Sequence, residues 1–179
     1  MDFRLYYRGQ LRANGSAAEK QRLRRHFHRQ LSRLWDQPPL LDHKLLLVNN
    51  RGAVGPAQAQ RQVGRFWFMP LISTAVGLVA ELEILFLRPQ RPGAIVGSAG
   101  DIDNRLKTLL DGLRVPDLGQ IAADDVPGEG EEPLHCLLED DVLITRLGVT
   151  TDQLLDSGDP AEALLVLKEA GPTRFWRFP

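Results

Sequence analysis

The chain has 179 residues, of which 43% are hydrophobic and 25% are charged, and its formal net charge is −1. These proportions are typical of one globular domain with a real core. There is no uninterrupted apolar run long enough to span a membrane, and the first residues lack the apolar centre of a signal peptide. Cys136 is the sole cysteine, which excludes an internal disulfide and a cysteine-based zinc site. We therefore expect no membrane partner and a location in the reducing cytoplasm.

The small net charge hides a strong asymmetry along the chain. Residues 1–44 carry ten Lys and Arg against four Asp and Glu, a balance of +6. Residues 101–141 carry twelve acids against three basic residues, a balance of −9. Basic surface can neutralise phosphates, whereas a dense acidic patch repels them unless a cation intervenes. The two blocks together favour a polyanionic substrate and a bound metal ion, although charge blocks are often only solvated faces.

The first part of the chain predicts a strand followed by an amphipathic helix. Residues 3–8 alternate apolar and polar side chains, which is typical of a half-buried strand. Ser16 and Glu19 form a capping-box pattern, so we expect a helix from Ser16 to the two prolines at 38 and 39. Its apolar stripe consists of Leu23, Phe27, Leu31 and Leu34, and its other face carries Arg22, Arg25, Arg29 and Arg33.

The middle of the chain predicts strands separated by loops. Residues 40–48 fit a short strand, residues 49–64 a long loop, and residues 65–69 an aromatic strand that meets Pro70. Residues 77–87 give the strongest strand pattern, which the prolines that follow interrupt.

The second half predicts a helix over residues 101–113, strands over 141–149 and 163–168, and a Gly/Pro-rich acidic surface insertion over about 114–134. Strands of this kind with few helices favour the α+β class. We therefore expect one domain over residues 1–179, with a small mixed β-sheet and flanking helices.

The segment around the start of the 101–113 helix carries the candidate chemistry. Ile102, Leu106, Leu109 and Leu113 form an apolar stripe, while Asp103, Lys107 and Asp111 recur every four residues on the other side with Asn104 beside them. An ordinary surface helix gives the same pattern. If the helix starts at or just after Asp101, however, the non-helical backbone of Asp101 lets its carboxylate converge with that of Asp103.

A third carboxylate is available where the 141–149 strand begins. Hard cations such as Mg²⁺ prefer carboxylate oxygens, and a helix N-terminus also attracts phosphate. Asp140 and Asp141 come at the entry of that strand, where side chains are often presented to a cleft. The alternative is a charged turn without a function.

These residues resemble those of the RusA family of Holliday-junction resolvases. The matching elements are Asp101-x-Asp103-Asn104-x-x-Lys107-x-x-x-Asp111-x-Leu113, then Asp140-Asp141-x-x-Ile144-x-x-Leu147-x-Val149, and the strand and Pro-Arg loop before Asp101. The resemblance covers roughly residues 78–113 and 139–149 and is weak over the first 75 residues. It implies a RusA-like fold, Mg²⁺-dependent (or Mn²⁺-dependent) cleavage of branched DNA, and a homodimer.

The resemblance also implies roles for individual residues. Asp101, Asp103 and Asp141 would bind the metal, and Lys107 would act in catalysis together with Asp103. Asp140 is an alternative metal ligand to Asp141, although the matches at Ile144 and Leu147 favour Asp141. Asn104 and Asp111 are secondary candidates for the site. DNA contacts are expected from Arg88, Arg91, Arg105 and Arg114, and from the basic helix face, which can equally be a solvated surface.

The insertion departs from the family, whose members need only a short turn there. It contains a second acidic pair, Asp124 and Asp125, which lacks the downstream Ile and Leu pattern and is rejected as the ligand. Two interpretations of this segment remain, an inert acidic loop and a regulatory lid.

Rival functions remain. Gly97 and Ser98, which precede the carboxylate pair, suggest a nucleotidyltransferase. In that class, however, the carboxylate pair normally lies on a strand, and more residues separate it from the Gly-Ser pair. A calcium-binding EF-hand loop fails because Arg105 and Leu106 occupy positions that need an oxygen ligand and a glycine. The non-enzymatic rival is a RusA-like fold that only binds nucleic acid or protein.

Overall fold

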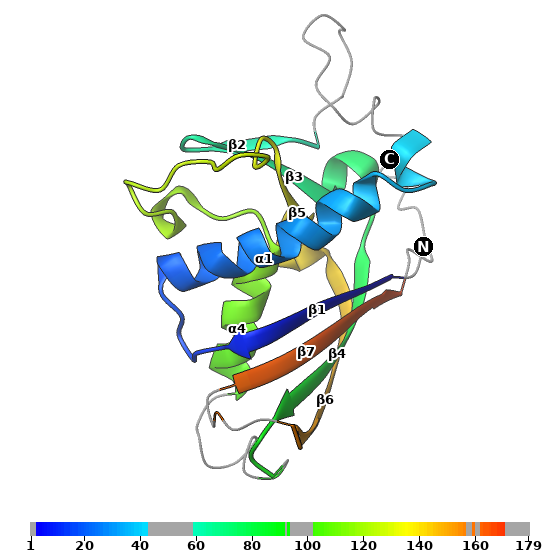
Figure 1. Cartoon of the computed structure of the whole chain (residues 1–179). Helices are drawn as coiled ribbons and strands as arrows, with labels where there is room; N and C mark the ends of the chain where they lie inside the picture. The colour runs from blue at the N-terminus through cyan, green and yellow to red at the C-terminus, as the bar shows by residue number, and fades with distance from the viewer. Residues whose placement is uncertain are drawn as a thin grey trace, which may run out of the picture.

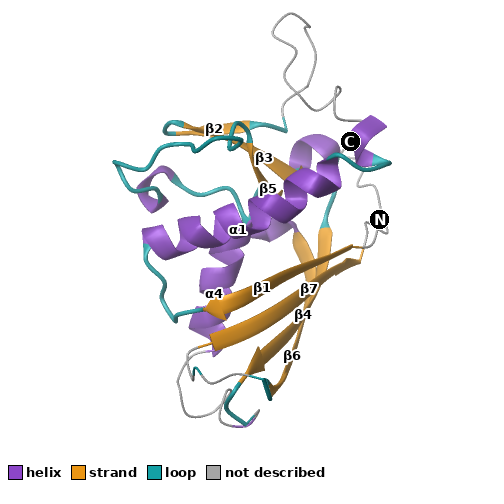
Figure 2. Ribbon diagram, in the orientation of Figure 1, coloured by secondary structure: helices purple, strands orange, loops and turns teal. Residues whose placement is uncertain are grey.

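The computed structural model describes residues 3–42, 59–91, 93, 102–156, 159 and 162–170, and it has two mixed β-sheets and two main helices (Figure 1, Figure 2). The larger sheet has the order β1-β7-β4-β6, with β1 Phe3–Gln10, β7 Glu162–Ala170, β4 Ala80–Arg88 and β6 Ile144–Gln153. The smaller sheet has the order β2-β3-β5, with β2 Arg61–Val63, β3 Phe66–Ile72 and β5 Leu134–Leu138. The α+β class with mixed β-structure and helices is confirmed, and the strands form two small sheets.

Each sheet mixes parallel and antiparallel pairs. In the larger sheet β1 and β4 pair antiparallel with β7, whereas β4 and β6 run parallel. In the smaller sheet β3 pairs antiparallel with β2 and parallel with β5. Parallel neighbours require a crossover, and the chain between β4 and β6 contains helix α4 (Ile102–Leu113), the insertion and β5. This crossover brings the two predicted halves of the site to one region of the molecule.

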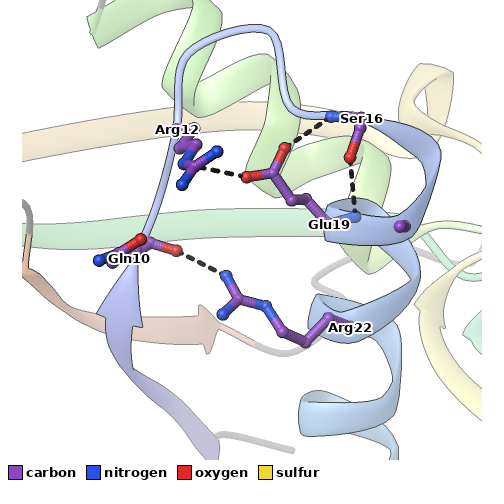
Figure 3. A pocket seen from close by; sticks show the side chains of 6 residues that line it. Gln10, Arg12, Ser16, Glu19 and Arg22 are labelled. Atoms are coloured by element: carbon purple, nitrogen blue, oxygen red, sulfur yellow. Dashed lines mark hydrogen bonds and ion pairs between the residues drawn. The ribbon is translucent and has the colours of Figure 1, made fainter.

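Helix α1 (Ala17–Trp35) begins at the predicted capping box. The Ser16 hydroxyl accepts a hydrogen bond from the Glu19 backbone at 3.3 Å, and the Glu19 carboxylate accepts one from the Ser16 backbone at 2.8 Å (Figure 3). Figure 3 also shows Arg12 paired with Glu19 at 3.3 Å and Arg22 donating to the Gln10 carbonyl at 2.9 Å. These contacts join the end of β1 to the first turns of α1.

One core lies between the inner face of the larger sheet and the two helices. Alternate residues of β4 are buried, and they join side chains of β1, β7, α1 and α4 in one cluster. Helices α1 and α4 approach closely at Gly112, where an added Cβ would lie 2.7 Å from the Leu23 Cβ. Only glycine allows this distance, so Gly112 fixes how deeply α4 seats against α1.

Several predicted boundaries need correction. Residues 40–42 are helical rather than strand, and β3 continues through Pro70 to Ile72. Strand β4 begins at Ala80 because residues 74–76 form a 3-10 turn (η1, Thr74–Val76) that ends at Gly77 with a φ of 66°. The predicted strand from Asp141 begins instead with a 3-10 turn (η3, Asp141–Leu143). Strands β2 and β5 were not predicted.

The acidic insertion is packed against α1. Arg25 forms ion pairs with Asp125 at 2.7 Å and Glu131 at 2.9 Å, and it donates to the Val126 carbonyl at 2.9 Å. His28 accepts from the His135 backbone N–H at 2.9 Å through Nδ1, so its Nε2 carries the proton donated to the Gly130 carbonyl at 3.1 Å. Burial lowers the pKa of His28, in keeping with this neutral form. The insertion therefore has a defined position across the first helix.

Among the residues that the structure describes, no helix has the length and apolar character needed to cross a membrane.

Candidate metal and phosphate site

A pocket of about 670 Å³ lies where α4 meets the start of β6. It is lined by Lys20, Asp103, Leu106, Lys107, Leu110, Asp111, Arg114, Gln120, Asp141 and Leu147. Five of the predicted site residues are therefore brought together: Asp103, Lys107, Asp111, Arg114 and Asp141. Asp101 lies outside the described residues.

The open part of the pocket is formed by Asp103, Lys107 and Asp141. Asp103 and Lys107 are exposed and lie one helical turn apart on α4. Asp141 is exposed at the start of η3, immediately before β6. The two segments are joined only through the long crossover, so their meeting depends on the parallel pairing of β4 and β6. Leu147, on the inner face of β6, supplies an apolar wall beside the charged groups.

The back of the pocket is a paired charge network around Asp111. Its carboxylate lies 2.7 Å from Lys20 Nζ and 3.3 Å from Arg114 Nε, and only 8% of its side chain is exposed. Burial alone would raise the pKa of Asp111, but the hydrogen bond and charge of Lys20, with those of Arg114, lower it. The Asp111 carboxyl is therefore ionised at neutral pH, and it is paired with the Lys20 and Arg114 side chains.

A buried arginine holds the end of α4 in place. Arg24 is 1% exposed and donates to the carbonyls of Asp111 at 2.6 Å and Arg114 at 3.1 Å. The last carbonyls of a helix have no partner within the helix, and Arg24 satisfies two of them here. Burial lowers the pKa of Arg24 to about 10, so the guanidinium stays charged at neutral pH. The position of the pocket's back wall thus depends on helix α1.

The neighbouring aspartates Asp140 and Asp141 have different surroundings. Asp140 caps η3 by accepting from the Val142 backbone N–H at 3.0 Å, and this bond lowers the pKa of its carboxyl. Desolvation, followed by the hydrogen bond and charge of Asp140, raises the pKa of Asp141. Asp140 serves the local turn, while Asp141 is the member of the pair that lines the pocket. This geometry agrees with the preference for Asp141 that the sequence pattern gave.

The remaining predicted residues have mainly internal contacts. The Asn104 carbonyl accepts from the Thr108 hydroxyl at 2.9 Å, and Asn104 does not line the pocket. Arg88 is buried, with a pKa lowered by desolvation and by the charge of Arg105. Arg105 donates to the Leu11 carbonyl. Arg114 is held by Asp111 and Asp117, and Arg91 is exposed.

The donor chemistry of the pocket fits a hard divalent cation in part. Asp103 and Asp141 both line one space, and carboxylate oxygens are the ligands that hard cations prefer. Within the described ranges there is no cluster of three or more His, Cys, Asp or Glu able to hold a metal. A complete ligand set therefore needs a further carboxylate, for which Asp101 is the candidate.

Comparison of the chain with models of protein families, with curated proteins and with solved structures gave no match. The resemblance to RusA resolvases therefore stays a prediction based on two motifs.

Two residues that line the pocket, Lys20 and Gln120, were not predicted from the sequence as site residues. Lys20 comes from α1, 91 positions before Asp111, and Gln120 comes from the insertion. The helical wheel offers a signal for Lys20, because it lies on the side of the apolar stripe and away from the basic face of Arg22, Arg25, Arg29 and Arg33. Gln120 shows that the insertion contributes to the wall of the pocket.

Proposed function

We propose that this chain is a divalent-metal-dependent endodeoxyribonuclease that hydrolyses phosphodiester bonds of branched DNA. The observation that carries the proposal is the meeting of Asp103, Lys107 and Asp141 in one pocket. Asp103 and Lys107 belong to the first motif and Asp141 to the second, and Asp141 follows Asp103 by 38 positions in the sequence. The choice of a four-way junction as substrate rests on the resemblance to RusA resolvases.

In this proposal Asp101, Asp103 and Asp141 hold Mg²⁺, or Mn²⁺ in its place. The ion, when bound, polarises the scissile phosphate and lowers the pKa of a water molecule. The Lys107 ammonium, one turn from Asp103, stabilises negative charge that develops on the phosphoryl oxygens. Lys107 is available for this role because the nearby Asp111 is already committed to Lys20 and Arg114.

The paired network at the back of the pocket has a positioning role. Lys20 and Arg114 hold the buried carboxylate of Asp111, and Arg114 is also paired with Asp117, so the charges of the network balance and it supports the wall of the pocket. A four-way junction has two symmetric points of scission, so the proposal takes two copies of the chain per junction.

The alternative is a nucleic-acid-binding module of the same fold. It is favoured by one observation, that the basic side chains of Lys20, Lys107 and Arg114 line the pocket and could contact phosphates without a metal ion. Such a module would bind branched DNA with no dependence on Mg²⁺ and would leave every strand intact.

The test is cleavage of a four-way junction, a duplex and a single strand with Mg²⁺ or Mn²⁺. Wild-type protein should cut the junction, whereas Asp103→Asn and Lys107→Ala should bind it without cutting. Arg65→Ala removes an exposed charge between β2 and β3, outside the pocket and outside the expected DNA contacts, and serves as the matched control. Failure of the wild type to cut any of these DNAs would overturn the nuclease, and binding without cutting would support the module.

A further inference from the structure

A smaller pocket, of about 290 Å³, lies between the first turns of α1 and the insertion, and we call it the insertion pocket. Its walls come from these two segments: Ala17, Ala18, Gln21 and Arg25 of α1, and Ala122, Asp124 and Asp125 of the insertion. Small-molecule sites usually have volumes of about 300–1,000 Å³. The insertion pocket therefore has room for one ring system and not for a large ligand.

Gln21 brings an unused hydrogen-bond donor to the insertion pocket. Its side chain is 2% exposed, and its Oε1 accepts from Arg24 Nη1 at 3.1 Å. Because the amide is planar, this bond turns Nε2 away from Arg24. In the part of the chain that the structure describes, the buried Nε2 has no hydrogen-bond partner. A buried N–H without an acceptor is unfavourable, so this position favours a ligand that carries an acceptor.

Asp124 supplies the opposite kind of group, a carboxylate with two acceptor oxygens. It is exposed in a turn that the Asp125 backbone N–H closes on the Ala122 carbonyl at 3.0 Å. Asp125 is paired with Arg25 at 2.7 Å, so the turn has a defined position on α1. Among the described residues, none forms an ion pair or hydrogen bond with the Asp124 carboxylate. Both of its oxygens are therefore available to a ligand.

The other charged groups of the insertion pocket are already paired. Arg25 binds Asp125 at 2.7 Å and Glu131 at 2.9 Å, and it donates to the Val126 carbonyl at 2.9 Å. The three alanines of the wall add small apolar surfaces. A ligand therefore finds one amide donor, one free carboxylate and an apolar wall.

We propose that the insertion pocket binds a guanine base. The Watson–Crick edge of guanine carries the O6 acceptor beside two donors, N1–H and N2–H. O6 accepts from Gln21 Nε2, and the two donors bind the two oxygens of Asp124. Adenine, cytosine and thymine each present a single donor position on that edge. Guanine is therefore the base that uses both the amide and the whole carboxylate, while the alanine methyl groups pack against its ring.

The base has two possible sources, a free nucleotide and an unpaired nucleotide of a strand. A strand is compatible with the structure because the insertion pocket adjoins the candidate metal and phosphate site. Arg24 donates to Gln21 at the one pocket and to Gln120 at 3.5 Å, and Gln120 lines the other. Only the strand source rests on the proposed nuclease, since guanine binding itself needs no metal ion and no cleavage.

The experiment is an NMR titration of the full chain with nucleoside monophosphates in the presence of EDTA. Guanosine monophosphate (GMP) should shift the backbone amide signals of residues 17–25 and 122–125 to saturation. Inosine monophosphate lacks the N2 amino group and should bind about tenfold more weakly, and adenosine monophosphate should bind more weakly still. Equal binding of the three nucleotides, or no GMP-dependent shift of these residues, would overturn the guanine site.

Gln21→Glu tests the donor. The variant keeps an oxygen for Arg24 but replaces the amide nitrogen with an acceptor, so GMP binding should weaken about tenfold or more. Circular dichroism checks that the variant folds.

Asp124→Asn tests the carboxylate. It removes a negative charge, which by itself would favour a nucleotide phosphate, yet it should weaken GMP binding because an acceptor is lost. Glu129→Gln makes the same change of charge at an exposed insertion residue outside the pocket and should not weaken GMP binding. Asp103→Asn, in the candidate metal site, should also bind GMP as wild type does. Unchanged GMP binding by either Gln21→Glu or Asp124→Asn would overturn the guanine site.

Two single strands distinguish the sources of the base, an oligothymidine and the same strand with one central guanine. Tighter binding of the guanine strand than of the oligothymidine, with shifts in the insertion pocket, assigns the base to a strand. Equal binding of the two strands, with GMP still shifting the pocket, assigns it to a free nucleotide. Either result supports the guanine site. Guanine binding by a chain that cuts no DNA would overturn the nuclease alone.

Discussion

The two halves of helix α4 differ in how their charges are used. In the C-terminal half, Asp111 is buried between Lys20 and Arg114, and Arg24 binds the final carbonyls. In the N-terminal half, Asp103 and Lys107 are exposed and face the pocket that also contains Asp141. One half therefore contributes to stability, and the other is available for chemistry. Spacing by four residues, which both halves share, does not distinguish these roles.

The largest effect should come from substitutions in the N-terminal half of α4, and they should change the activity and not the stability. In the proposed nuclease Asp103 holds the metal ion and Lys107 stabilises the developing charge, so Asp103→Asn and Lys107→Ala should each lower the cleavage rate by about 10²-fold or more. That loss equals about 3 kcal/mol of activation free energy. The thermal midpoint should stay within a degree or two of wild type, since both side chains are exposed. A clear drop in stability would show that this half is structural after all.

Arg24→Leu should have the largest effect on stability. The substitution leaves the carbonyls of Asp111 and Arg114 buried without their donor, which should cost about 3 kcal/mol of unfolding free energy. Urea denaturation followed by circular dichroism measures the change. Arg29→Leu, on the exposed side of the same helix, is the control and should change stability by less than about 0.5 kcal/mol. Equal effects would contradict the capping role of Arg24.

Gly112→Ala tests the close contact of the two helices. The new methyl group would meet the Leu23 Cβ at 2.7 Å, so α4 must move away from α1. Overpacking of this kind costs about 1–3 kcal/mol, even though alanine favours helix more than glycine does. Thermal unfolding measures the loss. A stabilised Gly112→Ala protein would show that α4 is not seated as described.

Asp111 should give the C-terminal half a pH dependence at low pH. Because its pKa is lowered in the fold, its contribution to stability is complete above the ordinary aspartate pKa of about 3.9. That contribution is lost as the pH falls through the lowered value, when the carboxyl is protonated. Asp111→Asn should be less stable than wild type at neutral pH, with the gap closing at the acidic end. If the difference in unfolding free energy between Asp111→Asn and wild type stayed the same from neutral to acidic pH, the ion pairs of Asp111 with Lys20 and Arg114 would be contradicted.

The smallest effect should come from the insertion. Arg25→Ala removes the ion pairs with Asp125 and Glu131, whose partly exposed groups are screened by solvent, so the loss should be about 1 kcal/mol or less. Amide hydrogen exchange should nevertheless rise locally over residues 125–131. Uniform exchange across the chain would show that Arg25 does not hold the insertion.

Local patterns predicted the elements whose signals lie within a few residues. The capping box at Ser16 and the stripe of Leu106, Leu109 and Leu113 located both helices, and alternation located β1 and β4. Strand β5 was missed because its sequence Leu-His-Cys-Leu-Leu has no alternation: it is buried at nearly every position. A fully buried short strand cannot be separated from other apolar runs by periodicity.

Contacts between distant residues could not be predicted in this way. On a helical wheel Lys20 and Arg24 lie on the side of the apolar stripe and Arg25 lies on the basic face, but the wheel does not say which distant residues they contact. The fold gives them three different partners: the α4 carbonyls, the insertion and Asp111. The sequence pattern grouped Asp103, Lys107 and Asp141, and the structure brings these three to one pocket, while metal binding and catalysis there stay predictions.

The most direct test of the metal site is binding of Mn²⁺ followed by paramagnetic broadening of backbone amide signals. The account predicts that Mn²⁺ broadens the signals around Asp103 and Asp141, and that Asp103→Asn and Asp141→Asn each weaken this binding. Asp125→Asn, in the acidic insertion, should leave it unchanged because Asp125 is paired with Arg25. Broadening centred on residues 124–132, or no saturable binding at all, would contradict a metal site at the junction of α4 and β6.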